Sequence, residues 1–130
     1  MRVYLASTAD ELQEFLAEKT LEVSEVYAPT DIYCSTHPEM DEEEIEYSLS
    51  LLAAEDSLEL VDDQTGAPLV IAFELPADYL GGFDEISAAL IKPLEWGRVE
   101  AIFEVGESAD DLTWFAAQEA ELRISDWLAR

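Results

Sequence analysis

The chain has 130 residues, of which 31 are Asp or Glu and 6 are Lys or Arg, so its formal net charge at pH 7 is −25. This charge repels phosphate backbones and anionic lipid headgroups, because sequence-independent affinity for nucleic acid comes from Lys and Arg. We therefore expect no direct nucleic-acid partner and no membrane partner. Hydrophobic residues make up 49% of the chain, which excludes a disordered acidic tail and predicts one folded domain over residues 1–130.

The cysteine content and the N-terminus bear on the compartment. The chain holds one cysteine, Cys34, which cannot form an internal disulfide, and no cysteine framework indicates secretion. The first residues lack the basic and apolar regions of a signal peptide, and no apolar run is long enough to span a bilayer. The sequence predicts a cytoplasmic protein.

The first elements predict a β-α-β unit. Residues 2–6 are rich in β-branched and aromatic side chains, the Ser-Thr pair at 7–8 can cap a helix, and apolar residues then recur at helical spacing to about residue 20. Residues 21–28 indicate a second strand, which Pro29 ends. Because a helix between two strands usually connects a parallel pair, we expect these strands to be parallel.

The middle of the chain holds the strongest helical pattern. An irregular segment over 30–38 precedes residues 40–60, which contain no Gly or Pro and place apolar side chains on two adjoining helical stripes. This predicts a long amphipathic helix whose acidic first turn suits the positive end of the helix dipole. Residues 69–75 are almost all apolar, which is typical of an interior strand.

The remaining residues predict further strands and a terminal helix. Residues 76–84 are expected to form a loop, 86–91 a short edge strand and 99–105 another strand. Ser108 precedes a helical pattern that continues to the C-terminal end. We therefore expect an α/β protein, of two-layer or α+β type. Its mixed sheet of four or five strands is flanked by the helix over 40–60 and a C-terminal helix.

An acidic segment supplies the candidate interaction site. Residues 39–46 hold six carboxylates in eight positions, and like charges four residues apart destabilise a helix. We interpret the segment either as a face that a cationic partner relieves or as a solvated helix start. Trp is common in interface hot spots, and Trp114 and Gln118 are expected on one helical face that is not plainly apolar. The candidate partner-binding residues are Glu39, Asp41, Glu42, Glu43, Glu44, Glu46, Tyr47, Trp114 and Gln118.

Metal and catalytic sites have less support in the sequence. Cys34 and His37 have the spacing of a zinc half-site, but structural zinc usually gathers four Cys and His ligands and the chain has one of each. A Cys–His nucleophile needs nearby positive charge, whereas this neighbourhood is negative. No EF-hand, P-loop, Rossmann or serine-hydrolase motif occurs. We predict no catalytic residue, no metal and no cofactor.

Three separated motifs carry a family resemblance. They are the opening MRVYL, the segment DEEEIEYSLSLLAAEDSL and the closing DDLTWFAAQE. In this order they resemble an uncharacterised actinobacterial family, a domain of unknown function. The resemblance implies a small cytoplasmic α/β protein from a high-GC Gram-positive bacterium and implies no activity. The residues that it carries over are Glu43, Glu44, Glu46, Tyr47, Trp114, Phe115, Gln118 and Glu119. In the family we expect a proline to interrupt the last segment, whereas this chain continues through 121–124 without one.

The sequence favours a non-enzymatic acidic domain that docks on a basic protein, for example a nucleic-acid-binding one, through the carboxylates of 39–46. The alternatives are a small enzyme or divalent-ion-binding protein that uses clustered carboxylates, and acidity that serves only solvation. An enzyme requires a concave site that holds two carboxylates or His37. Homo-oligomerisation stays open, because the alternating strand over 99–105 either covers an edge by pairing with a second copy or buries both sides.

Overall fold

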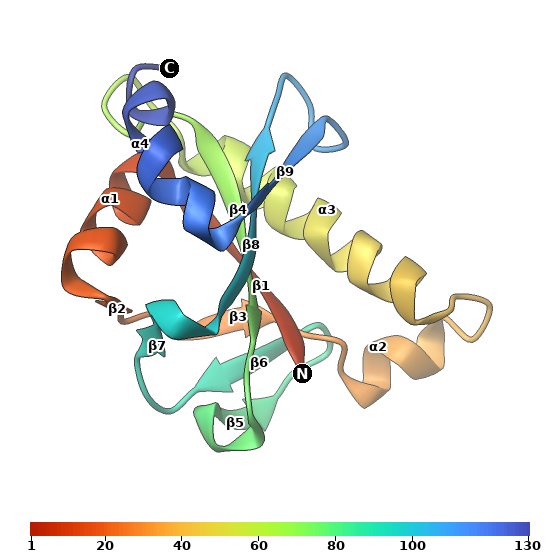
Figure 1. Ribbon diagram of the computed structural model, residues 1–130. Helices are drawn as coiled ribbons and strands as arrows, with labels where there is room; N and C mark the ends of the chain where they lie inside the picture. Colours follow the sequence, from red (N-terminus) through yellow and green to blue (C-terminus); the bar gives the residue numbers. More distant parts are fainter.

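The computed structural model describes residues 1–130 and is built on one large sheet (Figure 1). Its strands are β1 (Arg2–Thr8), β2 (Thr20–Leu21), β3 (Glu25–Tyr27), β4 (Pro68–Glu74), β5 (Leu80–Phe83), β6 (Ser87–Leu90), β7 (Leu94–Glu95), β8 (Val99–Val105) and β9 (Leu112–Ala116). Its helices are α1 (Ala9–Glu18), α2 (Asp31–Thr36), α3 (Glu42–Leu60) and α4 (Ala120–Leu128), with 3-10 turns η1 (Ala77–Tyr79), η2 (Trp96–Arg98) and η3 (Ala117–Glu119).

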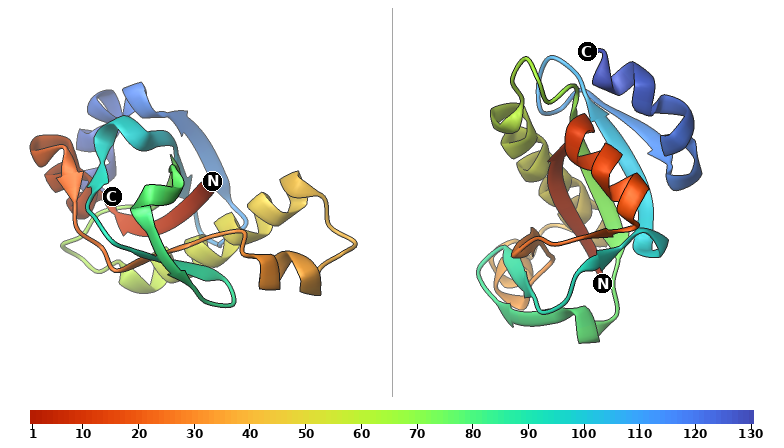
Figure 2. Two further views of the ribbon diagram at one scale, coloured as in Figure 1. Left: turned by 90° about the horizontal axis from the view of Figure 1, so that it is seen from below. Right: turned by 90° about the vertical axis from the view of Figure 1, so that its left-hand side faces the viewer.

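Seven strands form the main sheet in the order β5-β6-β3-β1-β4-β8-β9. Every neighbouring pair is antiparallel, and β2 and β7 form a separate antiparallel pair. Two views of the ribbon show the sheet between helices, with α1 and α4 on one face and α3 on the other (Figure 2). The chain is therefore an α+β protein whose antiparallel sheet is covered on both faces. None of its helices has the length and apolar character needed to cross a bilayer.

The sheet separates two hydrophobic cores. In β4, Leu69, Ile71 and Phe73 join a cluster of 19 buried residues on the side of α1 and α4. The alternate side chains Val70 and Ala72 join a cluster of 10 buried residues under α3. Because the strand is buried on both faces, its sequence reads as a continuous apolar run, as predicted for an interior strand.

Several predicted elements are confirmed. The strand over 99–105 is β8, and the long helix begins at Glu42 and ends at Leu60 as α3. Thr8 caps α1 by accepting a hydrogen bond from the backbone N–H of Glu11 at 3.3 Å. The C-cap of α1 is Lys19, a left-handed residue with φ of 66°.

The predicted parallel β-α-β opening is wrong. The segment over 21–28 does not form one strand, because residues 20–21 pair with β7 outside the main sheet and β3 begins only at Glu25. The chain enters β3 from the opposite direction, so β3 lies antiparallel to β1 with Tyr4 opposite Tyr27. The sheet is therefore not mixed.

The predicted count of four or five strands is also wrong, because strands of two to four residues are too short to show a hydrophobic period. The segment over 30–38 contains the helix α2, and the predicted loop over 76–84 contains η1 and the strand β5. The strand within 86–91 is β6, which lies between β5 and β3 and is not at an edge. The edges of the sheet are β5 and β9.

The C-terminal helix begins later than predicted. Residues 112–116 form the strand β9, which pairs with β8 and places Trp114 opposite Phe103. Ser108 does not cap a helix, since its hydroxyl donates to Asp110 Oδ1 at 2.6 Å in the turn between the two strands. The helix itself, α4, starts at Ala120.

Candidate functional site

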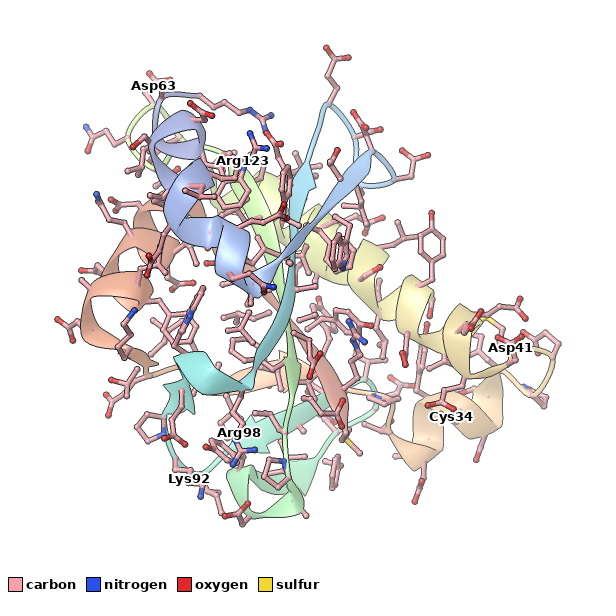
Figure 3. The ribbon with its side chains drawn as sticks, viewed as in Figure 1. Cys34, Asp41, Asp63, Lys92, Arg98 and Arg123 are labelled. Atoms are coloured by element: carbon pink, nitrogen blue, oxygen red, sulfur yellow. The ribbon has the colours of Figure 1, made fainter.

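The acidic start of α3 is exposed, and no ion pair neutralises it. Side chains of Glu39 and of residues 41–44 are exposed to solvent. The four ion pairs in the structure are Met1–Glu74, Lys19–Glu121, Lys92–Asp78 and Arg130–Glu104, so none involves this segment. Figure 3 shows the labelled cations Lys92, Arg98 and Arg123 on parts of the surface away from Asp41.

Two of these carboxylates also stabilise the helix. Asp41 is the N-cap of α3, and its Oδ1 accepts a hydrogen bond from the Glu44 backbone N–H at 2.9 Å. The Glu44 side chain in turn accepts from the Asp41 backbone N–H at 3.3 Å. This capping box satisfies two backbone donors that a helix start otherwise leaves open. The carboxylates of Glu39, Glu42 and Glu43 have no such partner in the chain.

Glu46 differs from the rest of the segment because it is partly buried. Burial raises the pKa of its carboxyl, the Arg2 charge opposes that rise, and Glu42, Glu74 and Glu43 add to it. Burial and Glu46 together raise the pKa of Tyr4 to about 12, against the charge of Arg2. Arg2, Glu46 and Glu74 line a cavity of about 430 Å³ beside the start of α3. Glu46 therefore belongs to the sheet side of the helix.

Tyr47 lies on the flank of α3 that faces away from β3. Asp56 marks the β3 flank, because it accepts a hydrogen bond from the Tyr27 hydroxyl. Tyr47 precedes Asp56 by nine positions, which is about two and a half turns, so it points to the opposite flank. Because β3 and the pair β8 and β9 lie on opposite sides of β1 in the sheet, this flank of α3 is the one nearer β8 and β9. Tyr47 is 55% exposed there, one turn beyond Glu43.

Trp114 lies on the same face of the sheet as α3. It pairs with Phe103 of β8, and Phe103 packs against the core cluster beneath the helix. Paired residues of antiparallel strands point to the same face. Trp114 is 58% exposed and belongs to the edge strand. We call Tyr47, Phe103 and Trp114 the aromatic flank.

Gln118 was predicted to share a helical face with Trp114, and the structure contradicts this arrangement. Trp114 is in β9, whereas Gln118 is exposed in η3, after the strand has ended. In the same turn Glu119 accepts a hydrogen bond from the Ala116 backbone N–H at 2.8 Å. The two side chains therefore do not stand on one helix.

Cys34 and His37 are in or next to α2 and form no metal cluster. Cys34 is exposed, and His37 Nδ1 lies 3.0 Å from the Tyr33 carbonyl oxygen while its ring lies tilted by 44° against the ring of Tyr33. No group of three or more His, Cys, Asp or Glu side chains is arranged to hold a metal ion.

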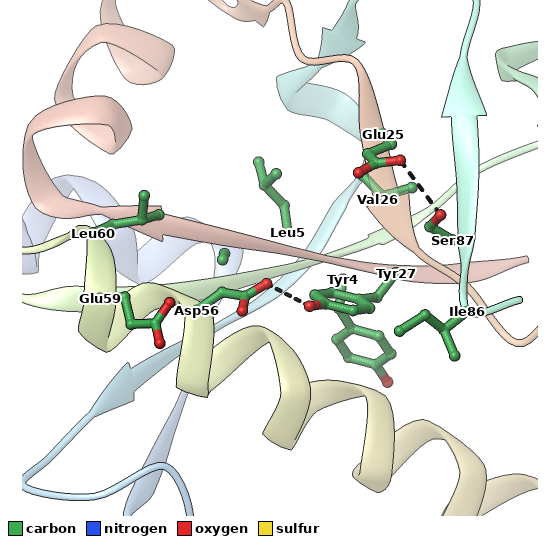
Figure 4. Close-up of a pocket in the computed structure, with 11 residues that line it drawn as sticks. Tyr4, Leu5, Glu25, Val26, Tyr27, Asp56, Glu59, Leu60, Ile86 and Ser87 are labelled. Carbon is green, nitrogen blue, oxygen red and sulfur yellow. Dashed lines mark hydrogen bonds between the residues drawn. The ribbon is translucent and has the colours of Figure 1, made fainter. Parts of the chain in front are cut away.

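A cavity of about 420 Å³ lies at the other end of α3, and no sequence motif indicates it. It is lined by Tyr4, Leu5, Ala6, Glu25, Val26, Tyr27, Asp56, Glu59, Leu60, Ile86 and Ser87. Figure 4 shows the hydrogen bond from Tyr27 to Asp56 at its wall and the contact of 3.4 Å between Ser87 Oγ and Glu25. Burial and the bond to Asp56 raise the pKa of Tyr27.

Residues 1–110 match the sequence profile of a family of unknown function, DUF6912. The chain belongs to this family. The resemblance to a domain of unknown function is thereby confirmed. The DUF6912 region contains the first two motifs, whereas nearly all of DDLTWFAAQE lies beyond it. No curated protein and no solved structure is significantly similar to the chain. DUF6912 membership assigns no activity, and the actinobacterial source stays a prediction.

Proposed function

We propose that this DUF6912 protein is a non-enzymatic acidic interaction domain that docks on a basic protein through the start of α3 and the aromatic flank. One observation carries the proposal. Two large aromatic side chains, Tyr47 and Trp114, are more than half exposed on the α3 face of the sheet, and Tyr47 stands one turn from Glu43 in a run of carboxylates that forms no ion pair. Interface hot spots are enriched in Trp and Tyr, and the rim around them is polar.

The two parts of this surface would act at different stages of binding. A net charge of −25 attracts a basic protein over roughly a Debye length, about 10 Å at 0.1 M salt, and so accelerates encounter. The aromatic side chains act after contact. Burying the exposed 58% of Trp114 removes on the order of 140 Å² from water, worth about 3.5 kcal/mol before entropic costs.

The carboxylates contribute unequally in this proposal. Asp41 and Glu44 bond to each other's backbone, and Glu46 faces the sheet. Glu42 and Glu43 are exposed and free of such bonds, as is Glu39. A basic partner therefore gains most from pairing with Glu39, Glu42 and Glu43, and it also relieves their mutual repulsion.

The enzyme alternative would use the cavity with Glu25, Asp56 and Glu59, since it is a concave site with several carboxylates. Two tyrosines line this cavity, Tyr4 and Tyr27, and burial raises the pKa of both. Both hydroxyls thus stay protonated at neutral pH, and that of Tyr27 serves as a hydrogen-bond donor to Asp56 and not as a base. Acid–base catalysis instead needs two groups whose pKa values bracket the working pH. Two protonated tyrosine hydroxyls suit hydrogen-bond donation to a ligand, which supports binding over proton transfer.

Affinity capture tests the proposal. The purified protein is exposed to a cell lysate at about 50 and about 500 mM salt, which brackets the screening of surface charge. We expect a basic protein to be retained at low salt and lost at high salt. The variant E42Q/E43Q/E44Q should lose it, and its glutamine at 44 still accepts the capping hydrogen bond.

A matched control separates the surface from the overall charge. The variant E14Q/E18Q/E22Q removes three exposed carboxylates in and after α1 and should retain the partner. Trp114→Ala should weaken retention by about 30-fold, the effect of a 2 kcal/mol hot spot. Equal loss in both triple variants, or no captured protein at all, would leave the acidity as solvation only.

A further inference from the structure

The cavity at the C-terminal end of α3 arises from the way the sheet opens. Strands β1 and β3 pair at one position, Tyr4 opposite Tyr27. Beyond it they diverge, so that residues 5–6 of β1 and 25–26 of β3 line a hollow of about 420 Å³. The last two turns of α3 close one side of this hollow, through Asp56, Glu59 and Leu60 (Figure 4).

The charge in the cavity is negative only. Glu25, Asp56 and Glu59 line it, no Lys, Arg or His does, and none of the three takes part in an ion pair. The end of α3 adds to this charge, because a helix dipole is negative at its C-terminus and the last turn of α3 has no basic residue. Acidic side chains are disfavoured at such a helix end, and a bound cation would relieve them.

The remaining walls of the cavity are apolar. On the α3 face these walls are Ala6, Ile86 and Leu60, whereas the buried side chains of Leu5 and Val26 belong to the core on the opposite face of the sheet. The ring of Tyr27 is held in the wall by its hydrogen bond to Asp56, and aromatic rings attract cations. A purely inorganic cation would leave these walls unused, whereas an ammonium group on an apolar body would contact both kinds of wall. The volume falls in the range of small-molecule sites.

We propose that this cavity binds a small organic ammonium compound. Its charged group lies between Asp56, Glu59 and Glu25, and its apolar body lies against Ala6, Ile86 and the ring of Tyr27. The site lies on the β3 flank of α3, opposite the aromatic flank, and it does not depend on the proposed protein partner.

Nuclear magnetic resonance titration with phenethylammonium tests this site, with 2-phenylethanol as the uncharged probe of the same shape. At constant ionic strength we expect saturable shifts of the amides of residues 25–27 and 56–60, with a Kd on the order of 1 mM for so small a probe. We expect phenethylammonium to bind about tenfold more tightly than 2-phenylethanol, because its ammonium group gains about two favourable charge contacts.

Two variants locate the charge. Asp56→Asn keeps an acceptor for the Tyr27 hydroxyl and Glu59→Gln keeps the side-chain shape, and each should weaken phenethylammonium binding about threefold. Glu100→Gln, an exposed change on β8, should leave the Kd unchanged, and thermal melts confirm that each variant is folded. Shifts that spread over all acidic surfaces without saturation, equal affinity for 2-phenylethanol, or equal weakening by Glu100→Gln would each overturn the proposal.

Discussion

Gly66 occupies a turn that leaves no space for a Cβ atom. This residue has φ of 73°, the left-handed region, in the turn between α3 and β4. The same turn holds two other elements: the Thr65 carbonyl oxygen accepts from the Asp10 N–H at 3.0 Å, and the Ala67 N–H donates to the Trp127 carbonyl oxygen at 2.9 Å. A Cβ at Gly66 would lie 2.7 Å from the Trp127 carbonyl oxygen. The change Gly66→Ala therefore forces backbone to move.

The expected cost has two parts. A left-handed φ costs a residue with a Cβ about 1–2 kcal/mol, and displacing packed backbone adds on the order of 1–2 kcal/mol. We expect Gly66→Ala to lower the free energy of unfolding by about 2–4 kcal/mol, which corresponds to a Tm lower by roughly 10 °C in a chain of this size. Urea denaturation followed by circular dichroism measures the change as a shift of midpoint at constant slope.

Two companion variants separate the causes. Gly82→Ala places its Cβ in open space and should change stability by less than about 0.5 kcal/mol. Gly66→Asn tolerates a positive φ but keeps the contact with the Trp127 carbonyl oxygen, so it should recover only part of the loss. If Gly66→Ala were as stable as the wild type, the reasoning on this turn would be refuted.

Three further variants probe the cap, the buried carboxylate and the core. Asp41→Ala removes the N-cap of α3 and should cost about 1 kcal/mol in urea denaturation. Glu46→Gln should raise the Tm at pH 7, because burial raises the pKa of this carboxyl and its charged form is the costly one. That gain should shrink as pH falls toward the ordinary value of 4.5, where the wild type also carries a neutral Glu46, so melts over this pH range check the sign. Trp127→Ala removes a side chain that is 2% exposed and packs edge-on against Phe115, and should cost about 3–5 kcal/mol by calorimetry.

The parts of the fold that the sequence predicts are those with long local patterns. The run of residues 42–60 has no helix breaker, and 69–75 is apolar because β4 is buried on both faces. The segment over 112–116 misleads for a related reason. Phe115 packs toward α4 and Leu112 toward α3, so the strand has apolar side chains on both faces. Its sequence therefore does not alternate between apolar and polar residues, and its apolar spacing also fits a helix.

The candidate sites divide in the same way. The acidic start of α3 is visible in the sequence because its residues are consecutive. The cavity is not visible, because Tyr27 and Asp56 are 29 positions apart and meet only through the antiparallel placement of β3 beside β1. The relation of Trp114 to Tyr47 likewise depends on the register of β9 on β8, which periodicity does not give.

The central claim is that charge brings a basic protein to α3 and that the aromatic flank holds it. The most direct measurement is the association and dissociation kinetics of the captured partner at about 50 and about 500 mM salt. For the wild type we predict an association rate that falls at least about tenfold at high salt. The variant E42Q/E43Q/E44Q should weaken this dependence, and Trp114→Ala should raise mainly the dissociation rate. An association rate that is independent of salt and equal in the wild type and the triple variant would contradict the account.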